Sequence, residues 1–149
     1  MLKDSLVEIF ERDLNKLRDE INLYKSEAEL WIVKGEISNS GGNLCLHLIG
    51  NLNHFIGAVL GETGFIRERD LEFSSKNVSR EKLNEEIAKT IEAVKIGLNK
   101  LSAEDFDKNF PIEKRGETVR MDFMLLHLFG HFSYHLGQIN YHRRLLLGE

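Results

Sequence analysis

The first part of the chain has apolar residues at every third or fourth position, which predicts a long amphipathic helix. The residues that form this stripe are Leu2, Leu6, Ile9, Phe10, Leu14, Leu17, Ile21, Tyr24 and Ala28. We expect the helix to fade between Trp31 and Gly35. The small polar residues and glycines of segment 38–43 then break the pattern and offer capping groups for a second helix.

Two further helices are predicted in the middle of the chain. The second covers about residues 43–60 and ends at Gly61, because glycine is favoured just after a helix. Residues 62–78 are polar and lack a clear period, so we interpret them as a connection with at most a short turn. Ser79 is a suitable cap for the third helix. Its buried stripe consists of Leu83, Ile87, Ile91, Val94 and Leu98.

The last predicted helix follows a longer connection. Within residues 102–120, two short segments flank Arg115 and Gly116, and this arrangement predicts a small hairpin. The fourth helix begins near Met121 and continues to about Leu147. Four helices joined by loops of different lengths predict an all-α fold, a four-helix bundle that forms one domain over residues 1–149.

The composition narrows the class of protein. The chain has 149 residues, enough for one buried core, and its 24 acidic residues exceed its 20 lysines and arginines. No cluster of lysine or arginine is longer than two, so we expect no nucleic-acid partner. Cys45 is the single cysteine, which excludes an internal disulfide and suits a reducing compartment. Because the N-terminal segment carries charges where a signal peptide needs an apolar core, we expect a cytoplasmic protein.

Charged residues are missing from two long segments, residues 37–61 and 123–142. In a chain with 30% charged residues, these gaps indicate that more than one face of each helix is buried. A membrane span would also lack charge, and the second gap is nearly long enough. However, its histidines, together with Gln138 and Asn140, would be costly in lipid. Burial inside the bundle is therefore the better interpretation, and we expect no membrane partner.

The two uncharged segments contain all six histidines of the protein. A neutral imidazole can be buried at modest cost and is a good ligand for zinc, nickel or iron. His131 and His135 are four residues apart and therefore project from one face of the last helix. At about 100° per residue they lie roughly 80° and 40° from the centre of the apolar arc, and His127 lies past its edge. The alternative is that each ring is a hydrogen-bonded core residue.

A third ligand can come from the second helix, where His47 and His54 are seven residues apart on one face. The spacing does not choose between them. Glycines at positions 50, 57 and 61 flank this face and permit close approach of another helix. Neither uncharged segment carries a carboxylate, which argues against a di-iron bundle. Three neutral imidazoles would leave a divalent ion its full charge, which favours hydroxide or thiolate as the remaining ligand.

Residues 131–138, with the sequence HFSYHLGQ, resemble the HxxxHxGQ motif of the DinB/YfiT-like family of four-helix-bundle metalloproteins. Segments 47–51, 64–69 and 138–144 are similar to one uncharacterised branch of that family. The resemblance implies that His47, His131 and His135 bind a divalent metal, zinc or nickel, and so selects His47 over His54. It also implies a homodimer. Several relatives transfer a low-molecular-weight thiol such as bacillithiol or mycothiol.

The leading functional hypothesis is a metal-dependent thiol S-transferase acting on a small-molecule substrate, in which the metal lowers the pKa of a thiol cosubstrate. One alternative is a hydrolase that uses metal-bound water, and another is a non-catalytic dimeric protein that binds a metal or ligand. The lack of acidic residues on the two uncharged helices favours thiol chemistry or no chemistry over hydrolysis.

Several other polar residues are candidates for supporting roles. The candidates for orienting a ligand ring or contacting substrate are Asn51, His54, Gln138 and His142. The candidates for binding a carboxylate of the thiol, with solvated surface as the alternative role, are Arg67, Arg69, Arg143 and Arg144. We interpret Cys45 as a packed small residue.

Overall fold

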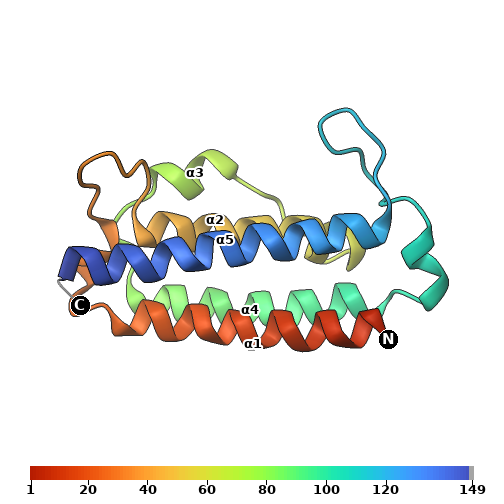
Figure 1. The fold of residues 1–149 in the computed structure, drawn as a ribbon, viewed down its shortest axis with the longest axis horizontal. Helices are drawn as coiled ribbons and strands as arrows, with labels where there is room; N and C mark the ends of the chain where they lie inside the picture. Colours follow the sequence, from red (N-terminus) through yellow and green to blue (C-terminus); the bar gives the residue numbers. More distant parts are fainter. Residues whose placement is uncertain (148–149) are drawn as a thin grey trace.

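Four long helices run side by side along the long axis of the molecule (Figure 1). The computed structural model describes residues 1–147. The long helices are α1 (Leu2–Leu23), α2 (Gly41–Leu52) with its continuation η2 (Asn53–Leu60), α4 (Arg80–Asn99) and α5 (Met121–Leu147). α1 packs mainly against α4, and α2 packs against α5, so that two pairs enclose one core. The predicted all-α, single-domain fold is confirmed.

The first helix is shorter than its apolar stripe predicts. α1 ends at Leu23, because Tyr24 adopts an extended conformation with φ −60° and ψ 136°. This turn directs the tyrosine ring into the core, where 1% of its surface is exposed. A short 3-10 helix, η1 (Glu27–Trp31), follows and places Leu30 and Trp31 against the core. The prediction that the helix continues to residue 31 was therefore wrong.

The second helix begins two residues earlier than predicted and changes its geometry part-way. Ser40 caps α2, and its hydroxyl accepts a hydrogen bond from the Asn43 N–H at 3.2 Å. From Asn53 the helix widens into the π-helix η2. There the backbone of Ile56 lies directly against α4, since a Cβ added at Gly97 would be 2.3 Å from the Ile56 carbonyl oxygen. The sequence pattern predicts a regular helix and does not reveal this wider turn.

The polar segment 62–78 contains a short helix, α3 (Arg69–Ser74), which packs on α2. The Asn43 side chain fixes it there by donating hydrogen bonds to the carbonyls of Glu72 (3.0 Å) and Ser75 (2.8 Å). The predicted connection is therefore also a structural element, and it places the side chain of Glu72 over α2.

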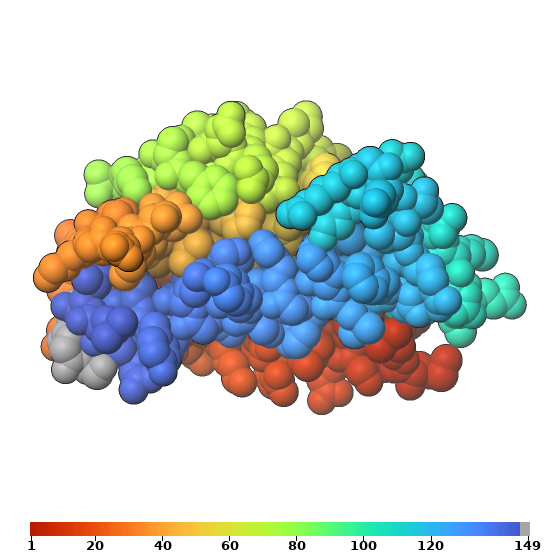
Figure 2. All heavy atoms as spheres, turned by 45° about the horizontal axis from the view of Figure 1, so that its top comes forward, coloured from red at the N-terminus to blue at the C-terminus, as the bar shows by residue number. Residues whose placement is uncertain are grey.

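The long connection before α5 begins with a 3-10 helix, η3 (Ala103–Asp107), and continues into a tight turn. Within residues 1–147 the predicted hairpin consists of two isolated bridges, Asn109 to Arg120 and Lys114 to Glu117, without regular strands. In Figure 2 this loop (cyan) lies on the same face of the molecule as the segment around α3 (yellow-green).

The two uncharged segments differ in burial. In α2, Leu46 is partly buried and every other residue is buried, as predicted. By contrast, the outer face of α5 is open to solvent, with 59% of Phe123, 66% of Tyr134 and 62% of Tyr141 exposed. The prediction that more than one face of the last helix is buried was therefore wrong. Among the described residues, the helix Gly41–Leu60 is long and apolar enough to cross a membrane, and 67% of its most apolar stretch is buried inside the protein.

Candidate metal centre

Three histidines from two helices meet at the interface of α2 and α5. His47 lies on α2, and His131 and His135 lie one turn apart on α5. One nitrogen of each ring lies within 4.8 Å of the others, and the Nε2 atoms of His47 and His131 are 3.1 Å apart. With Zn–N distances of about 2.1 Å, ligand nitrogens of a tetrahedral zinc lie ~3.4 Å apart. The three rings can therefore hold one metal ion with only small adjustments.

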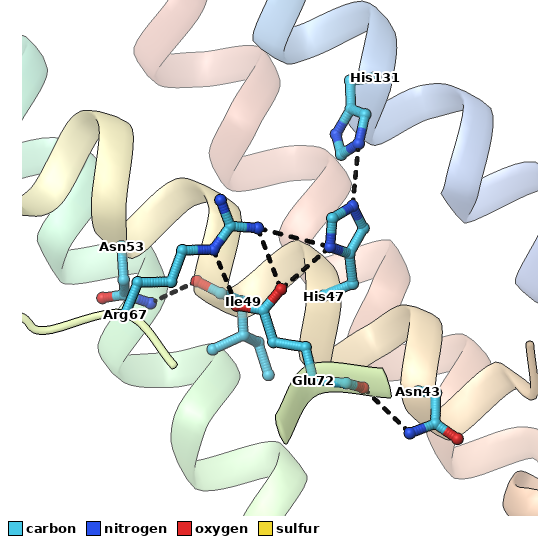
Figure 3. Close-up of polar contacts among 7 residues, drawn as sticks. All are labelled: Asn43, His47, Ile49, Asn53, Arg67, Glu72 and His131. Carbon is cyan, nitrogen blue, oxygen red and sulfur yellow. Dashed lines mark hydrogen bonds and ion pairs between the residues drawn. The ribbon is translucent and has the colours of Figure 1, made fainter. Parts of the chain in front are cut away.

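The orientation of His47 is fixed by a buried carboxylate (Figure 3). Its Nδ1 lies 3.0 Å from Oε1 of Glu72, which accepts the Nδ1–H and leaves the Nε2 lone pair towards the other histidines. Arg67 in turn holds Glu72 through two hydrogen bonds, from Nε at 2.9 Å and from Nη2 at 3.0 Å. Nη2 also lies 3.5 Å from Nδ1 of His47, but both nitrogens carry protons in this tautomer, so Glu72 is the acceptor.

Glu72 is suited to this role because it stays ionised. Burial raises the pKa of its carboxyl, but the hydrogen bonds from His47 and Arg67, with the charge of Arg67, outweigh that effect and hold the pKa below its ordinary value. An ionised carboxylate can only accept hydrogen bonds. It therefore keeps the proton of His47 on Nδ1 and its metal-binding lone pair on Nε2.

His131 and His135 differ in whether a protein group accepts a hydrogen bond from Nδ1. Gln138 accepts the Nδ1–H of His135 through Oε1 at 2.7 Å, which again turns Nε2 towards the centre. The Nδ1 atom of His131 is buried and has no hydrogen-bond partner among residues 1–147. The support of the third ring is therefore incomplete in the polypeptide alone.

The rings of His131 and His135 are both uncharged at neutral pH. Burial, followed by the nearby His135 and His47 rings, lowers the pKa of His131 to about 4. Burial also lowers the pKa of His135, although its hydrogen bond with Gln138 opposes the shift. A neutral imidazole is the form that binds a metal, so no proton has to leave these two rings before an ion binds.

The model of one protein family matches residues 4–149, almost the whole chain, and is described as "Protein of unknown function (DUF1572)". The chain belongs to the DUF1572 family. No curated protein and no solved structure matches it significantly. The family description assigns no function.

The candidate supporting residues of this DUF1572 protein lie in different places relative to the three histidines. Gln138 contacts a metal-site histidine, as described above. Asn51 is buried beside His47 and His131, where all three line a pocket of about 310 Å³. His142 lies elsewhere in the core: the Tyr24 hydroxyl is 2.6 Å from its Nδ1, and its Nε2 donates to the Ile32 carbonyl at 2.9 Å. His142 therefore ties α5 to the segment after α1.

His54 does not join the group. It lies in η2 with its ring 4.7 Å from that of Phe55, and burial followed by the charge of Arg67 lowers its pKa. His54 follows His47 by seven residues, which is about two turns or roughly 10 Å along the helix axis, so its ring cannot reach an ion held by His47. The position of α2 relative to α5 brings His47, and not His54, to His131 and His135.

The remaining candidates lie away from the centre or play other roles. Arg143 pairs with Glu20 of α1 at 3.0 Å, and Arg144 lies over the ring of Tyr141. His127 is exposed and contacts Lys114. Cys45 is fully buried, and burial raises its pKa to about 12, which agrees with a packed, unreactive residue.

Sequence reasoning missed the pairing of Glu72 with His47. No carboxylate lies on either uncharged helix, as noted, but α3 supplies one from the segment interpreted as a connection. The feature of the sequence that could have indicated a side chain packed beside His47 is Gly50, one turn later on α2. A Cβ at this position would lie 1.8 Å from Oε2 of Glu72, so Gly50 makes room for this carboxylate of α3, while Gly57 and Gly61 lie against Ala93 and Gly97 of α4.

Proposed function

We propose that the protein is a metal-dependent enzyme of the DinB/YfiT-like type that binds zinc or nickel through His47, His131 and His135 and transfers a small thiol. The observation that supports this most directly is the convergence of three ring nitrogens within 4.8 Å. The placement of the DUF1572 family in the DinB-like clan agrees with the resemblance of the histidine motifs.

The donor set fits such an ion. Three imidazoles suit zinc or nickel, and a carboxylate behind one ligand is the usual support of a metal-binding histidine. Two surface pockets reach the ligands, one lined by His47 and His131 and the other by His135. Access from solvent favours a catalytic role over a closed structural site. A metal bound here supplies a positive centre that lowers the pKa of a coordinated thiol.

The protein residues around the centre favour thiol chemistry over hydrolysis. Hydrolysis needs a base to take a proton from water. Glu72 is engaged by His47 and Arg67 and has a lowered pKa, which makes it a poor base. Glu113, the acid that lines the pocket of His47 and His131, is exposed. A thiol whose pKa is lowered by the metal needs no such base.

Metal content is the first test. Protein without a histidine tag, loaded with zinc and desalted, should retain one ion per chain by elemental analysis, and His131→Ala should lose it. The matched control is His127→Ala, one turn earlier on α5, which should retain the ion. Full retention by His131→Ala would contradict the ligand assignment.

Activity is the second test. Zinc-loaded protein should accelerate the reaction of bacillithiol or another cellular thiol with an electrophile such as monochlorobimane, and His131→Ala should not. Metal-dependent ester hydrolysis without a thiol would favour the hydrolase. Absence of both reactions in metal-loaded protein would favour a binding protein.

The α5 surface supports the implied homodimer. Its exposed side carries Phe123, Tyr134 and Tyr141, together with Gly130 and Gly137, where an added Cβ would meet nothing within 4 Å. Glycines seven residues apart leave a flat strip that permits close approach of another helix. Because residues 123–142 carry no charge of their own, most of this face is uncharged and can pack against the same face of a second copy. We therefore propose that a second copy covers it.

A further inference from the structure

The pocket beside His47 and His131 is strongly positive. Its volume is about 310 Å³, and its lining includes Arg67, Arg69, Lys114 and Arg115 against one acid, Glu113. The whole chain has a net charge of −4, so this concentration of cations opposes the overall balance. We call these four cationic residues and the space between them the cationic pocket.

Most of these charges lack a counter-ion within residues 1–147. Arg69 lies over the ring of Phe73, 5.2 Å from its centroid, and has no ion pair. Lys114 contacts the imidazole of His127, and the side chain of Arg115 has neither a hydrogen bond nor an ion pair in the described chain. Cations that outnumber the nearby acids repel one another, and a bound anion relieves that repulsion.

Hydrogen bonds hold the backbone of the turn that carries Lys114 and Arg115 and the side chain of Arg67. The backbones of Lys114 and Glu117 exchange two hydrogen bonds, of 2.8 and 2.9 Å, around a two-residue turn. Arg115 occupies the first turn position with φ 51°, which is unfavourable for a residue other than glycine or asparagine. Arg67 is held by Glu72 through Nε and Nη2, and its third nitrogen points away from Glu72 in Figure 3.

The inner end of the pocket contains unused hydrogen-bonding groups. Asn51 is more than nine-tenths buried, and its Oδ1 has no partner among the described residues. The Nδ1 of His131, at the same end, is also buried and unpartnered. Buried polar atoms are normally paired, so an anionic ligand in this pocket can accept the Nδ1–H of His131, and a hydroxyl or amide of the same ligand can donate to Oδ1 of Asn51.

We infer that the cationic pocket binds an anionic group, a carboxylate or a phosphate, of the small molecule whose reacting atom lies at the histidine centre. The inference rests on the proposed function and specifies its substrate class as small acids. The other pocket that reaches the ligands, beside His135, is lined by Glu36 and by uncharged residues such as Tyr134 and Tyr141, and so offers no comparable contact to an anion.

The test is direct binding of simple anions. Inorganic phosphate and succinate are titrated by calorimetry into protein freed of metal with a chelator and into zinc-loaded protein, with succinamide as the neutral analogue. At least one anion should bind, succinamide should not, and the double variant Lys114→Gln/Arg115→Gln should bind at least tenfold more weakly. Comparison of the affinities for phosphate and succinate shows whether the pocket prefers a phosphate or a carboxylate.

Two control variants make the test specific. Arg144→Gln removes an exposed arginine outside the pocket and should leave binding unchanged, whereas Glu113→Gln should strengthen it. Equal anion affinity in the wild type and the double variant, or equal binding of succinamide, would overturn the inference. Anion binding by metal-free protein that fails to retain zinc would support the pocket and refute the metal centre. If the protein retains zinc but the double variant binds anions as tightly as the wild type, the metal centre is supported and the cationic pocket is refuted.

Discussion

Helices α2 and α5 each contain a long segment without charged residues, but the two segments differ in how much of their surface is buried. α2 is enclosed by α3, α4 and α5, so its lack of charge reflects burial. α5 buries one side in the core, presents His131 and His135 at its edge, and leaves a third side in solvent. A charge-free helix therefore does not by itself indicate a buried one, because it can also reserve a surface for a partner.

The strongest test of this contrast exchanges glycine for alanine on each helix. A Cβ at Gly50 of α2 would lie 1.8 Å from Glu72 Oε2 and displace the carboxylate, whereas a Cβ at Gly130 of α5 meets nothing within 4 Å. We expect Gly50→Ala to lower the free energy of unfolding by ~1–3 kcal/mol through overpacking. Gly130→Ala, the matched control, should raise it by up to ~1 kcal/mol through helix propensity. Denaturant titration measures both, and similar effects at the two sites would contradict the contrast.

A second test compares the supports of the ligands on the two helices. Glu72→Gln removes the buried acceptor of His47 and should weaken zinc binding by about 10–100-fold in a competition assay with a fluorescent chelator. Gln138→Ala removes the exposed acceptor of His135 and should have a smaller effect, because water can replace the amide. A larger loss for Gln138→Ala would show that α5, and not α2, fixes the geometry of the centre.

The third prediction concerns the exposed side of α5. Gly137→Arg places a charge on the apolar face, so the dimer dissociation constant should rise at least tenfold, about 1.4 kcal/mol. Light scattering after gel filtration should then detect the 17.2 kDa chain as a monomer. Glu92→Arg, at an exposed position of α4, is the control and should leave the dimer intact. A wild-type chain that is monomeric at high concentration would refute the dimer.

The smallest expected effect is a pH dependence of the stability that His142 contributes by connecting α5 to the segment after α1. Burial lowers the pKa of His142 despite its hydrogen bond to Ile32, so the unfolded chain, with a pKa near 6.5, gains the proton first as pH falls. The stabilising contribution is complete above the unfolded pKa and declines as pH falls towards the folded pKa. One such group changes stability by at most ~1.4 kcal/mol per pH unit.

His142→Gln isolates this contribution. In metal-free protein, the variant should lose less unfolding free energy than the wild type between pH 7 and pH 5, with the other buried histidines providing the common background. This range extends from about half a unit above to about 1.5 units below the ordinary imidazole pKa of ~6.5. Identical slopes for the two proteins would show that His142 does not titrate in this range.

The sequence predicted most of what depends on local periodicity. The stripe of α4, the cap at Ser79 and the shared face of His131 and His135 all follow from spacing within one helix. The partner histidine on α2 did not follow from spacing, because its choice depends on how the two helices are aligned and rotated against each other. The resemblance selected His47 where the periodicity left His54 open.

The position of Glu72 could not be predicted from the sequence for another reason. It lies on a six-residue helix whose position is set by hydrogen bonds from Asn43, 29 residues earlier in the chain, and such a contact has no period. Likewise, the end of α1 depends on the burial of Tyr24 under α5, which overrides a continuous apolar stripe. Local patterns thus predicted the helices and two of the three clustered histidines, and tertiary contacts supplied the rest.

The separation of the ligands along the chain has a consequence for folding. His47 and His131 are 84 residues apart, so an ion held between them acts as a reversible crosslink that closes more than half of the polypeptide into a loop. In the chain-entropy model, a permanent link of that span removes ~4–5 kcal/mol of conformational freedom from the denatured ensemble. Chelation should consequently lower the melting temperature of the whole bundle, and the loss should be greatest for the pairing of α2 with α5.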